Sequence, residues 1–567
     1  MTTRTTSPVA RRGRLAGAAL ATVLLATACT SGGLPGANAG GPGAVVPVRQ
    51  GGSIVIGAEQ EPDCADWIST CAGSIWGTYV MDVPTMPRAF VPRKSGDGWA
   101  PVPSDVLAGE PAVSTAGTQQ KVTYRINPAA VWSDKEPITS EDLKYTALQI
   151  RDGKDVLDKT GYSHVTAVDT PDPKTAVVTF DAPYANWRAL FSDTVGIFPS
   201  HLLAGKDRNA LMKDGYSFSG GPWQIESWKR GASVTLVPNP NYWGEKPKLD
   251  KVTFQFTADT AAAFQAFKSG QLDALYPTPQ LDSVDQIKNG LPNAHSEVDA
   301  ASGNLEALWM NNGKFPFDSK TFRQAVSYSV DRKAIVARLY GALGVTAPAQ
   351  SFITPIMAQY GADDFSQYTL DLAKVSSLMQ GDGWAKGSDG IWVKAGQRAS
   401  FSVASIAGNK RRELTEQILQ QQLKTAGFEL TIANTTAGAL FSKVTPVGNF
   451  QLGLWTLVDT FPQPSLNQSF STAAVPVAAN GNSGLNFSRI SSPELDQALG
   501  TLSTSLDQNT RVGAAKQADQ LLGRDASSLP IVAVPNVLLW NRKIGGPLSI
   551  NPSSGPFWNL AQWGLAA

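Results

Sequence analysis

The feature that most restricts the fold of this sequence is the length of chain that carries fold-forming patterns. Residues 51–567 hold strand and helix patterns throughout, and a chain of that length is more than one hydrophobic core usually holds. Short β-patterned runs alternate with helical periodicities, as where "KVTYRI" precedes "SEDLKYTALQI". No unit of about 20 to 50 residues recurs, so a solenoid or a propeller is not indicated. We therefore expect an α/β fold with two or more lobes.

The first 50 residues differ from this globular part. Four arginines precede an uncharged apolar run at residues 15–28, which is shorter than the roughly 20 residues that span a bilayer and is typical of a secretory signal. The stretch "LLATACTSGG" places Cys29 directly after this run. It resembles a bacterial lipobox, in which the cysteine thiol is acylated and the chain is cut just before it. An ordinary signal peptide with an unrelated cysteine is the alternative.

We interpret residues 1–28 as a lipoprotein signal peptide and residues 29–50 as a flexible tether. The tether consists almost entirely of Gly, Ala, Pro, Ser and Val, a composition that cannot bury a core. Two or more acyl chains on Cys29 would hold the protein stably at a membrane, whereas one chain holds only marginally. The expected location is therefore the extracellular face of the cell membrane, or the periplasmic space.

Charge and motif content argue against several classes of function. Without the four leader arginines, 44 Lys and Arg stand against 47 Asp and Glu, so no basic excess indicates a nucleic-acid partner. The sequence has no G-x-S-x-G elbow, phosphate loop or metal-binding motif. Its three histidines are scattered and leave little for general-base chemistry. We expect no enzymatic activity, no cofactor and no bound metal.

The two remaining cysteines, Cys64 and Cys71, lie in "EPDCADWISTC". In an exported protein, such a pair is most simply a disulfide. A metal site is the alternative, although the sequence offers no CxxC or HxxxH spacing to complete one. Trp67 lies between the two cysteines and Trp76 follows them, and either could face a ligand cleft.

Local signals define the elements of the globular part. We predict a helix after Thr139 as N-cap, with Asp142 in the third helical position, and a hairpin over residues 164–180 that turns at "PDP". Strand patterns follow at residues 223–228, 233–238 and 251–256. Helical periodicity then appears in "TAAAFQAFKSG", "TFRQAVSYSV", "RKAIVARLYG" and "RRELTEQILQQQLKTAG".

In this order, these segments resemble the large extracellular solute-binding proteins of ABC importers, family 5, which includes the dipeptide- and oligopeptide-binding proteins. The matching pieces are "EPITSEDLKYT", "GGPWQIESW", "NPNYWGEKPKLDKVTF", "AFKSGQLDALYP", "NNGKFPFDSKTFRQAVSYSVDRKAIV", "LMQGDGWAKGSDGIWVKAG", "RRELTEQILQQQLKTAG" and "NFSRISSPELDQAL". They extend over nearly all of the chain beyond the tether. The lipobox and "EPDCADWISTC" resemble actinobacterial members most.

The resemblance implies a two-lobed, periplasmic-binding-protein-like α/β fold, with an extra small mixed domain inserted in the first lobe. By this reading, lobe I comprises residues 51–84, 217–300 and 536–567, and the inserted domain comprises residues 85–216. Lobe II is residues 301–535. The chain would cross between the lobes near Gly303 and near Pro535, and these crossings would form a hinge.

The function implied by the resemblance is that of a lipid-anchored receptor. It would bind a short peptide between the lobes and deliver it to ABC permease subunits driven by cytoplasmic ATPases, as a monomer. An oligosaccharide or another small solute is the alternative ligand, because the 15 tryptophans could stack on sugar rings. A surface sensor or adhesive lipoprotein, and a secreted hydrolase, are further alternatives.

For the ligand's ammonium group, the resemblance indicates Asp459. The stretch "WTLVDTFPQP" resembles a family pattern in which an aspartate follows a strand containing tryptophan, although the spacing is one residue longer and Thr460 stands where an aromatic residue is common. Trp455 shares a strand face with Asp459 and could form an apolar wall. A turn-capping role is the alternative for Asp459, and core packing is the alternative for Trp455.

For the ligand's carboxylate, we predict Arg411 and Arg412 in "GNKRREL", which resembles the start of the corresponding helix in dipeptide-binding relatives. Cations in the first turn of a helix oppose its dipole, so a pair of them invites an anionic partner. Only one of the two would point inward, and we prefer Arg412. The alternative is that both are surface arginines near Glu413 and Glu416.

Overall fold

The structure is a computed structural model that describes residues 45–567 apart from residues 96–97, 118, 193–194, 301, 460–462 and 552–553. The predicted signal peptide, Cys29, Thr460 and most of the tether lie outside the described residues. None of the helices in the described part combines the length and apolar character that crossing a membrane requires.

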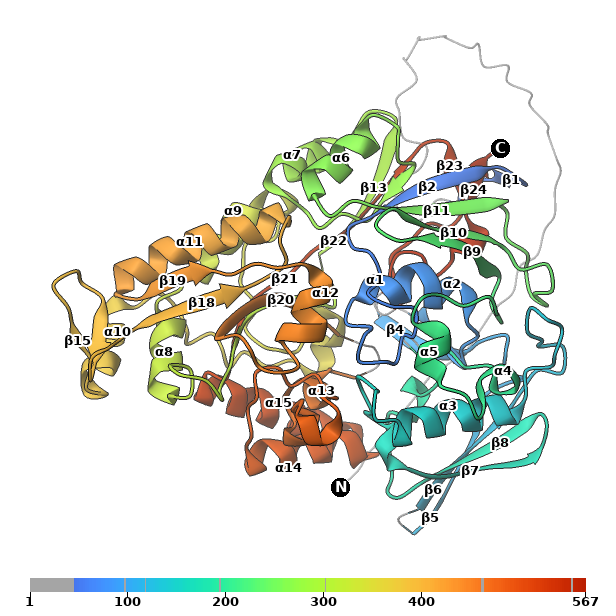
Figure 1. The fold of residues 1–567 in the computed structure, drawn as a ribbon, viewed down its shortest axis with the longest axis horizontal. Coiled ribbons are helices and arrows are strands. Elements are labelled where there is room, and N and C mark those ends of the chain that lie inside the picture. The colour runs from blue at the N-terminus through green and yellow to red at the C-terminus, as the bar shows by residue number, and fades with distance from the viewer. Residues whose placement is uncertain are drawn as a thin grey trace, which may run out of the picture. The chain divides into compact units, whose positions relative to one another are not determined.

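A seven-stranded sheet forms lobe I, with the order β13-β22-β12-β2-β11-β10-β9 (Figure 1). Strand β2 lies in its centre and runs parallel to both neighbours, β11 and β12. Ile54 and Ile56 of this strand are buried. The strands are β2 (Ser53–Ala58), β9 (Trp223–Lys229), β10 (Ser233–Pro238), β11 (Lys251–Phe256), β12 (Ala274–Leu275), β13 (Ala294–Asp299) and β22 (Asn536–Asn541). All three strands predicted at residues 223–256 are therefore confirmed.

A five-stranded sheet with the order β19-β18-β20-β14-β21 forms lobe II. Figure 1 shows helices on both of its sides, with α9 and α11 on one side and α8, α14 and α15 on the other. Because both faces are covered, the central strands are apolar in both directions, as in β20, where four consecutive residues are buried. The strands are β14 (Asn304–Met310), β18 (Ser400–Ala404), β19 (Glu429–Ile432), β20 (Leu452–Val458) and β21 (Leu529–Ala533).

The predicted helix signals correspond to helices in the structure. Asp331 caps α9 by accepting the Ala334 N–H (2.9 Å), and Gly427 ends α11 in the left-handed conformation. The helices of lobe II are α8 (Lys320–Tyr328), α9 (Arg332–Tyr340), α10 (Leu372–Gly381), α11 (Lys410–Ala426), α12 (Ala437–Ala439), α13 (Leu466–Phe470), α14 (Pro493–Thr504) and α15 (Gln508–Asp525). Lobe I holds α1 (Ile75–Gly77), α2 (Val83–Thr85), α6 (Thr260–Lys268) and α7 (Leu281–Asn289).

The chain passes from one sheet to the other twice, between β13 and β14 and between β21 and β22. The two connections lie side by side, because the Val534 N–H donates to the Asn304 carbonyl (2.7 Å) and the Ser302 hydroxyl donates to the Val534 carbonyl (2.5 Å). Gly303 and Pro535, the predicted hinge positions, lie in these connections. The structure thus pairs the two crossings into one narrow connection.

The inserted segment builds a four-stranded antiparallel sheet, β5-β6-β8-β7, against which α3 packs. The predicted capping box of α3 is present, since the Asp142 carboxylate accepts the Thr139 N–H (2.8 Å). Strand β7 continues through Asp172, so the hairpin turns at residues 173–174 and only the last proline of the predicted "PDP" turn lies in it. The elements are β5 (Ala112–Ala116), β6 (Gln119–Arg125), α3 (Ser140–Asp152), β7 (Val165–Asp172), β8 (Thr175–Phe180), α4 (Ser200–Leu203) and α5 (Arg208–Met212).

This inserted domain shares its core with lobe I. Val122 and Val178 of its sheet belong to the same buried apolar cluster as Ile54 and Phe254 of the lobe I sheet. Lobe II has a separate cluster. We therefore expect the inserted domain to move with lobe I.

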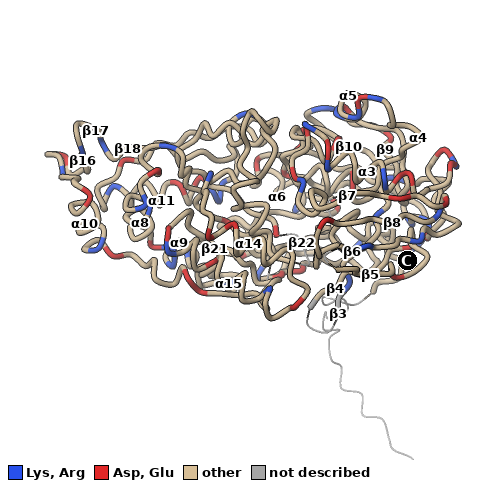
Figure 2. Tube along the Cα trace, turned by 90° about the horizontal axis from the view of Figure 1, so that it is seen from below, with Lys and Arg blue, Asp and Glu red and all other residues tan. Residues whose placement is uncertain are grey.

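Short strands complete the described fold. They are β1 (Val48–Arg49), β23 (Ile544–Gly545) and β24 (Gly564–Ala566) in one sheet, β15 (Ala385–Lys386), β16 (Trp392–Lys394) and β17 (Gln397–Arg398) in another, and the hairpin of β3 (Phe90–Ser95) and β4 (Gly98–Pro103). Figure 2 shows Lys and Arg interspersed with Asp and Glu along the trace, in keeping with the nearly balanced charge of the sequence.

Candidate ligand-binding cleft

A cavity of about 400 Å³ is lined by residues from lobe I, the inserted domain and lobe II. Lobe I contributes Glu59 directly after β2, and lobe II contributes Arg411 and Arg412 at the start of α11. The inserted domain contributes Asp158 and Tyr184. A concave site of this size, with few charged groups among many aromatic rings, is typical of small-ligand binding. We call this cavity the cleft.

The two arginines of the cleft share one carboxylate, that of Glu306 on β14. Arg412 binds it through Nε to Oε1 (2.8 Å) and Nη2 to Oε2 (3.1 Å), and Arg411 through Nη1 to Oε1 (2.9 Å) and Nη2 to Oε2 (3.2 Å). Thr456 of β20 donates to the same carboxylate (2.6 Å) and accepts from Arg412 (2.9 Å). Both predicted arginines therefore face inward, and neither is a surface residue, with exposed fractions of 2% and 5%.

This cluster carries one positive charge more than its carboxylate neutralises. Burial alone would raise the pKa of Glu306, but the guanidinium groups of Arg411 and Arg412 outweigh that effect and hold the pKa well below its usual range. Glu306 is therefore ionised at neutral pH and balances one arginine. Nε of Arg411 has no hydrogen-bond partner within the described structure. Because both arginines line the cleft, the net positive charge of the cluster suits an anionic group of a ligand.

Asp459 lies behind the cleft wall and does not line the cleft. It is fully buried, and its carboxylate accepts the Ser465 N–H (2.6 Å) and the Thr354 hydroxyl (2.5 Å). Burial raises its pKa, and these hydrogen bonds oppose the shift. Its backbone N–H donates to the Gly303 carbonyl at the first lobe crossing (2.8 Å). In this conformation, the carboxylate joins two loops next to the hinge.

Trp455 both packs in the core and lines the cleft. Its ring stacks on Trp309 with centroids 5.9 Å apart, and the Trp309 Nε1–H donates to the Trp455 carbonyl (2.9 Å). From lobe I, Trp67 and Trp76 also line the cleft, as the sequence suggested. Aromatic rings from both lobes therefore provide apolar walls.

Glu59, whose carboxylate lies in the cleft wall, already has hydrogen-bond partners. It accepts the Thr278 N–H (2.6 Å) and the Thr278 hydroxyl (2.7 Å). Burial raises the pKa of Glu59, and both these hydrogen bonds and the positive charges of Arg411 and Arg412 oppose that shift. Glu59 thus fixes the loop after β12 in the wall.

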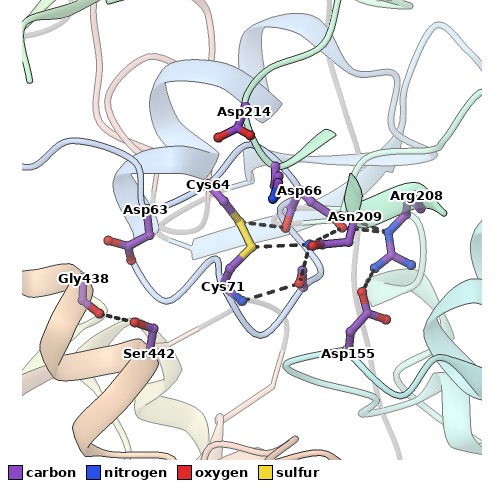
Figure 3. The surroundings of a disulfide bond; sticks show 12 residues. Asp63, Cys64, Asp66, Cys71, Asp155, Arg208, Asn209, Asp214, Gly438 and Ser442 are labelled. Carbon is purple, nitrogen blue, oxygen red and sulfur yellow. Dashed lines mark hydrogen bonds and ion pairs between the residues drawn. A yellow bond between two sulfur atoms is a disulfide. The ribbon is translucent and has the colours of Figure 1, made fainter. Parts of the chain in front are cut away.

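The predicted disulfide between Cys64 and Cys71 is present and the pair is therefore not a metal site. Figure 3 shows it beside Asn209, whose amide donates to the Cys71 sulfur (3.5 Å), and beside the buried ion pair of Asp66 with Arg208 (2.9 Å). The loop that it closes carries Trp67 and Ile68 into the cleft wall. Within the described residues, no group of three His, Cys, Asp or Glu could hold a metal ion.

Three charged residues near the cleft were not predicted from the sequence: Glu306, Glu59 and Asp158. Glu306 had a detectable signal, because it is the one charged residue in the apolar strand "NLEALWM", and a buried charge requires a partner. Asp158 had no such signal, since the sequence of its loop resembles that of any polar connection. Its place in the cleft depends on packing between residues far apart in the chain.

Two lobes joined by paired crossings, with a cleft between them, are typical of a two-lobed solute-binding protein. The family model "Bacterial extracellular solute-binding proteins, family 5 Middle" matches residues 105–475. The chain belongs to this family, as the sequence motifs indicated.

Individual relatives agree with this assignment. Oligopeptide-binding protein OppA of Mycobacterium tuberculosis is 29% identical over 469 residues, which cover 80% of this chain and 75% of OppA. Among solved structures, the oligopeptide-binding protein AppA of Bacillus subtilis in complex with a nonapeptide has a TM-score of 0.80 at 20% identity, covering 92% of this chain and 100% of AppA. The periplasmic EDTA-binding protein EppA has a TM-score of 0.78 at 22% identity, covering 92% and 98%. These structures confirm the two-lobed fold.

Proposed function

We propose that this protein is the substrate-binding component of an ABC importer, and that it binds short peptides in the cleft and delivers them to membrane permease subunits driven by cytoplasmic ATPases. The observation that carries the proposal is the Arg411, Arg412 and Glu306 cluster, because two guanidinium groups against one carboxylate give it a net positive charge, both arginines line the cleft, and this suits a peptide's terminal carboxylate. The name of the OppA relative supports the same ligand class.

The rest of the wall fits a ligand whose side chains vary. Trp67, Trp76 and Trp455 provide broad apolar surfaces, and these accept many side chains without specific hydrogen bonds. Specific contacts would then go to the charged ends and backbone of the peptide, which all peptides share. We propose binding without a catalytic step, which the names of the oligopeptide-binding relatives support.

One observation favours a second ligand class. The abundance of tryptophan and tyrosine in the wall also suits stacking on sugar rings or another small solute, and EppA shows that this fold is not restricted to peptides. A sensor or adhesive lipoprotein that binds the same ligands without a permease is the alternative to import.

Native mass spectrometry of the purified protein, followed by identification of what dissociates, tests the proposal. A series of added masses that sequence as short peptides would support it and reveal the preferred length. A single sugar-like mass would contradict it and favour the second ligand class. Loss of peptide uptake in a deletion strain, restored by the gene, would separate import from sensing.

We also propose that Cys29 carries the lipid anchor and that the protein acts as a monomer. The Cys29→Ser variant should appear in the culture medium instead of the membrane fraction, while the Cys64→Ser/Cys71→Ser variant should stay with the membrane. Equal membrane retention of the Cys29→Ser variant would refute the anchor.

A further inference from the structure

We infer that Asp158 of the inserted domain binds the positively charged nitrogen of the ligand. This nitrogen is either the α-ammonium group of a peptide or the side-chain cation of a lysine or arginine within it. The inference rests on the proposed peptide-binding function and adds the position of the ligand's cation. It assigns to the inserted domain a direct part in ligand recognition.

Asp158 lines the cleft without a cationic partner. Its Oδ1 accepts the Thr160 N–H (2.9 Å), and no Lys, Arg or His of the described residues pairs with it. The neighbouring acidic residues differ, because Asp152 pairs with Arg151 (2.6 Å) and Asp155 pairs with Arg208 (2.6 Å). In this segment, the carboxylate that faces the cleft is therefore the one left without a cation.

The backbone around Asp158 is fixed from two sides. The Leu157 N–H donates to the Ile68 carbonyl in the disulfide loop (2.8 Å), and the Leu157 carbonyl accepts the Gly484 N–H of lobe II (2.8 Å). The Ser483 hydroxyl also donates to the Val156 carbonyl. Contacts to both lobes therefore hold the backbone next to this carboxylate in the conformation that the structure describes.

Among the carboxylates near the cleft, Asp158 differs in its charged surroundings, because the charges of Arg411 and Arg412 act on Glu59 whereas no cation within the described part of the chain acts on Asp158. Glu59 receives two hydrogen bonds from Thr278, and Asp459 lies behind the wall, bonded to Thr354 and Ser465. Burial raises the pKa of Asp158, and the Thr160 backbone and side chain oppose this shift. A ligand cation would compensate the desolvation that no protein cation compensates.

Two tyrosines complete the surroundings of Asp158. Tyr162 and Tyr184 line the same cleft, and burial raises the pKa of both phenols, with the nearby charge of Asp158 adding to the shift. Aromatic rings next to a carboxylate favour ammonium and guanidinium groups. The Arg411 and Arg412 cluster lies on lobe II, so the cleft carries its excess charges of opposite sign on different lobes, as a zwitterionic ligand requires.

Isothermal titration calorimetry with alanine peptides of two to five residues tests the inference, using wild type, Asp158→Asn and Asp169→Asn. Asp169 is an exposed acidic residue of the same domain, so its variant removes the same charge away from the cleft. We expect Asp158→Asn to weaken binding roughly 10- to 100-fold and Asp169→Asn to leave it unchanged. Asp158→Ser serves as a second variant, with urea unfolding to verify that each protein is folded.

N-acetylated peptides and peptides with one internal lysine distinguish the two sources of the cation. If Asp158 binds the α-ammonium group, acetylation weakens binding to wild type but not to Asp158→Asn. If it binds a basic side chain, the lysine peptide gains affinity only in wild type. Wild-type affinity of the variants for every peptide would overturn the Asp158 assignment alone, whereas a wild type that binds none of the peptides would overturn the proposed function with it.

Discussion

At the scale of single residues, the Arg411, Arg412 and Glu306 cluster combines a structural and a binding role. A carboxylate buried in a sheet costs free energy unless cations pair with it, and Glu306 has two such partners. One arginine is enough to balance the charge of Glu306, so the second arginine adds an excess positive charge. The excess positive charge is thus available to a ligand, whereas the ion pairing with Glu306 holds α11 against β14.

Glu306→Gln should destabilise the protein by about 3 kcal/mol, because it leaves two buried guanidinium groups without a counter-charge. The measurement is the free energy of unfolding in urea. Glu429→Gln is the matched control, since Glu429 is half exposed and lies 3.5 Å from Arg398; it should change stability by less than about 0.5 kcal/mol. Equal effects of the two variants would contradict the buried-cluster interpretation.

Arg412→Ala should weaken binding of peptides with a free carboxylate by about tenfold or more. Arg411 remains to neutralise Glu306, so the variant removes mainly the excess charge. Calorimetry with free and C-terminally amidated peptides measures the effect, and the loss should be confined to the free acids. Arg398→Ala, which removes an exposed arginine of the same lobe, is the control. An equal loss for amidated peptides would instead indicate a general distortion of the cleft.

At the scale of elements, the disulfide loop connects cleft wall and inserted domain. The Thr70 N–H donates to the Asp155 carbonyl (2.6 Å) and the Leu157 N–H donates to the Ile68 carbonyl (2.8 Å), so the loop pairs with the segment that leads to Asp158. Figure 3 shows Asp155 and Arg208 beside the disulfide.

Cys64→Ser/Cys71→Ser should lower the free energy of unfolding by roughly 2 to 3 kcal/mol, because a closed loop restricts the unfolded chain. It should also weaken ligand binding, since the loop carries Trp67 into the wall. Thermal unfolding with and without a reducing agent measures the first effect, and the variant itself should not respond to the agent. A reductant-insensitive wild type would contradict this prediction.

Helix α15 contains a buried carboxylate that should make stability pH-dependent. Burial raises the pKa of Asp519 to about 7, while a hydrogen bond from the Phe352 N–H (2.9 Å) opposes the shift. The unfolded chain releases this proton near pH 4, so folding binds a proton between about pH 4 and pH 7. The contribution of Asp519 to stability therefore falls as the pH rises through that window.

Asp519→Asn should accordingly gain stability relative to wild type between pH 5 and pH 8, by about 1 kcal/mol or more. Urea unfolding at both pH values measures the change, with Asp169→Asn as the exposed control. A difference between variant and wild type that is the same at both pH values would show that Asp519 titrates normally.

At the scale of the whole molecule, lobe II contacts the inserted domain at a point where a glycine is required. Gly481 has a φ of +69°, and a Cβ atom there would lie 2.2 Å from the Lys154 carbonyl oxygen of the inserted domain. A Cβ atom is essentially never found that close to another heavy atom. A side chain at this position therefore opposes the approach of the two lobes.

Gly481→Ala should weaken ligand binding several-fold by hindering this contact. Gly390→Ala is the matched control, because Gly390 has a similar φ of +81° but open space around its Cβ position; both variants incur the left-handed strain of about 1 kcal/mol. Calorimetry gives the affinities and small-angle scattering with and without ligand gives the change in radius of gyration. Equal affinities of the two variants would contradict a role for this contact in closure.

The sequence alone determined the local elements and the family of this protein. Strand periodicity, the caps at Thr139 and Asp331 and the C-terminal glycine of α11 are local signals, because a cap satisfies backbone groups within one turn of its own residue. The order of the motifs was sufficient to predict two lobes, and the cysteine spacing to predict the disulfide. The inward position of Arg412 was predicted as a preference, but the expectation that only one of the two arginines would point inward was wrong, because Glu306 pairs with both.

Only the tertiary structure decided what those charged residues contact. Arg411 and Arg412 meet Glu306 from more than 100 positions away in the chain, and Asp459 turns to Thr354 instead of the cleft, because a buried carboxylate takes the nearest donors that folding supplies. Asp158 carries no local signal, and its place in the cleft follows from the pairing of the neighbouring Leu157 with residues 68 and 484. Burial and electrostatic partners arise from the packing of distant segments, which no local pattern of residues encodes.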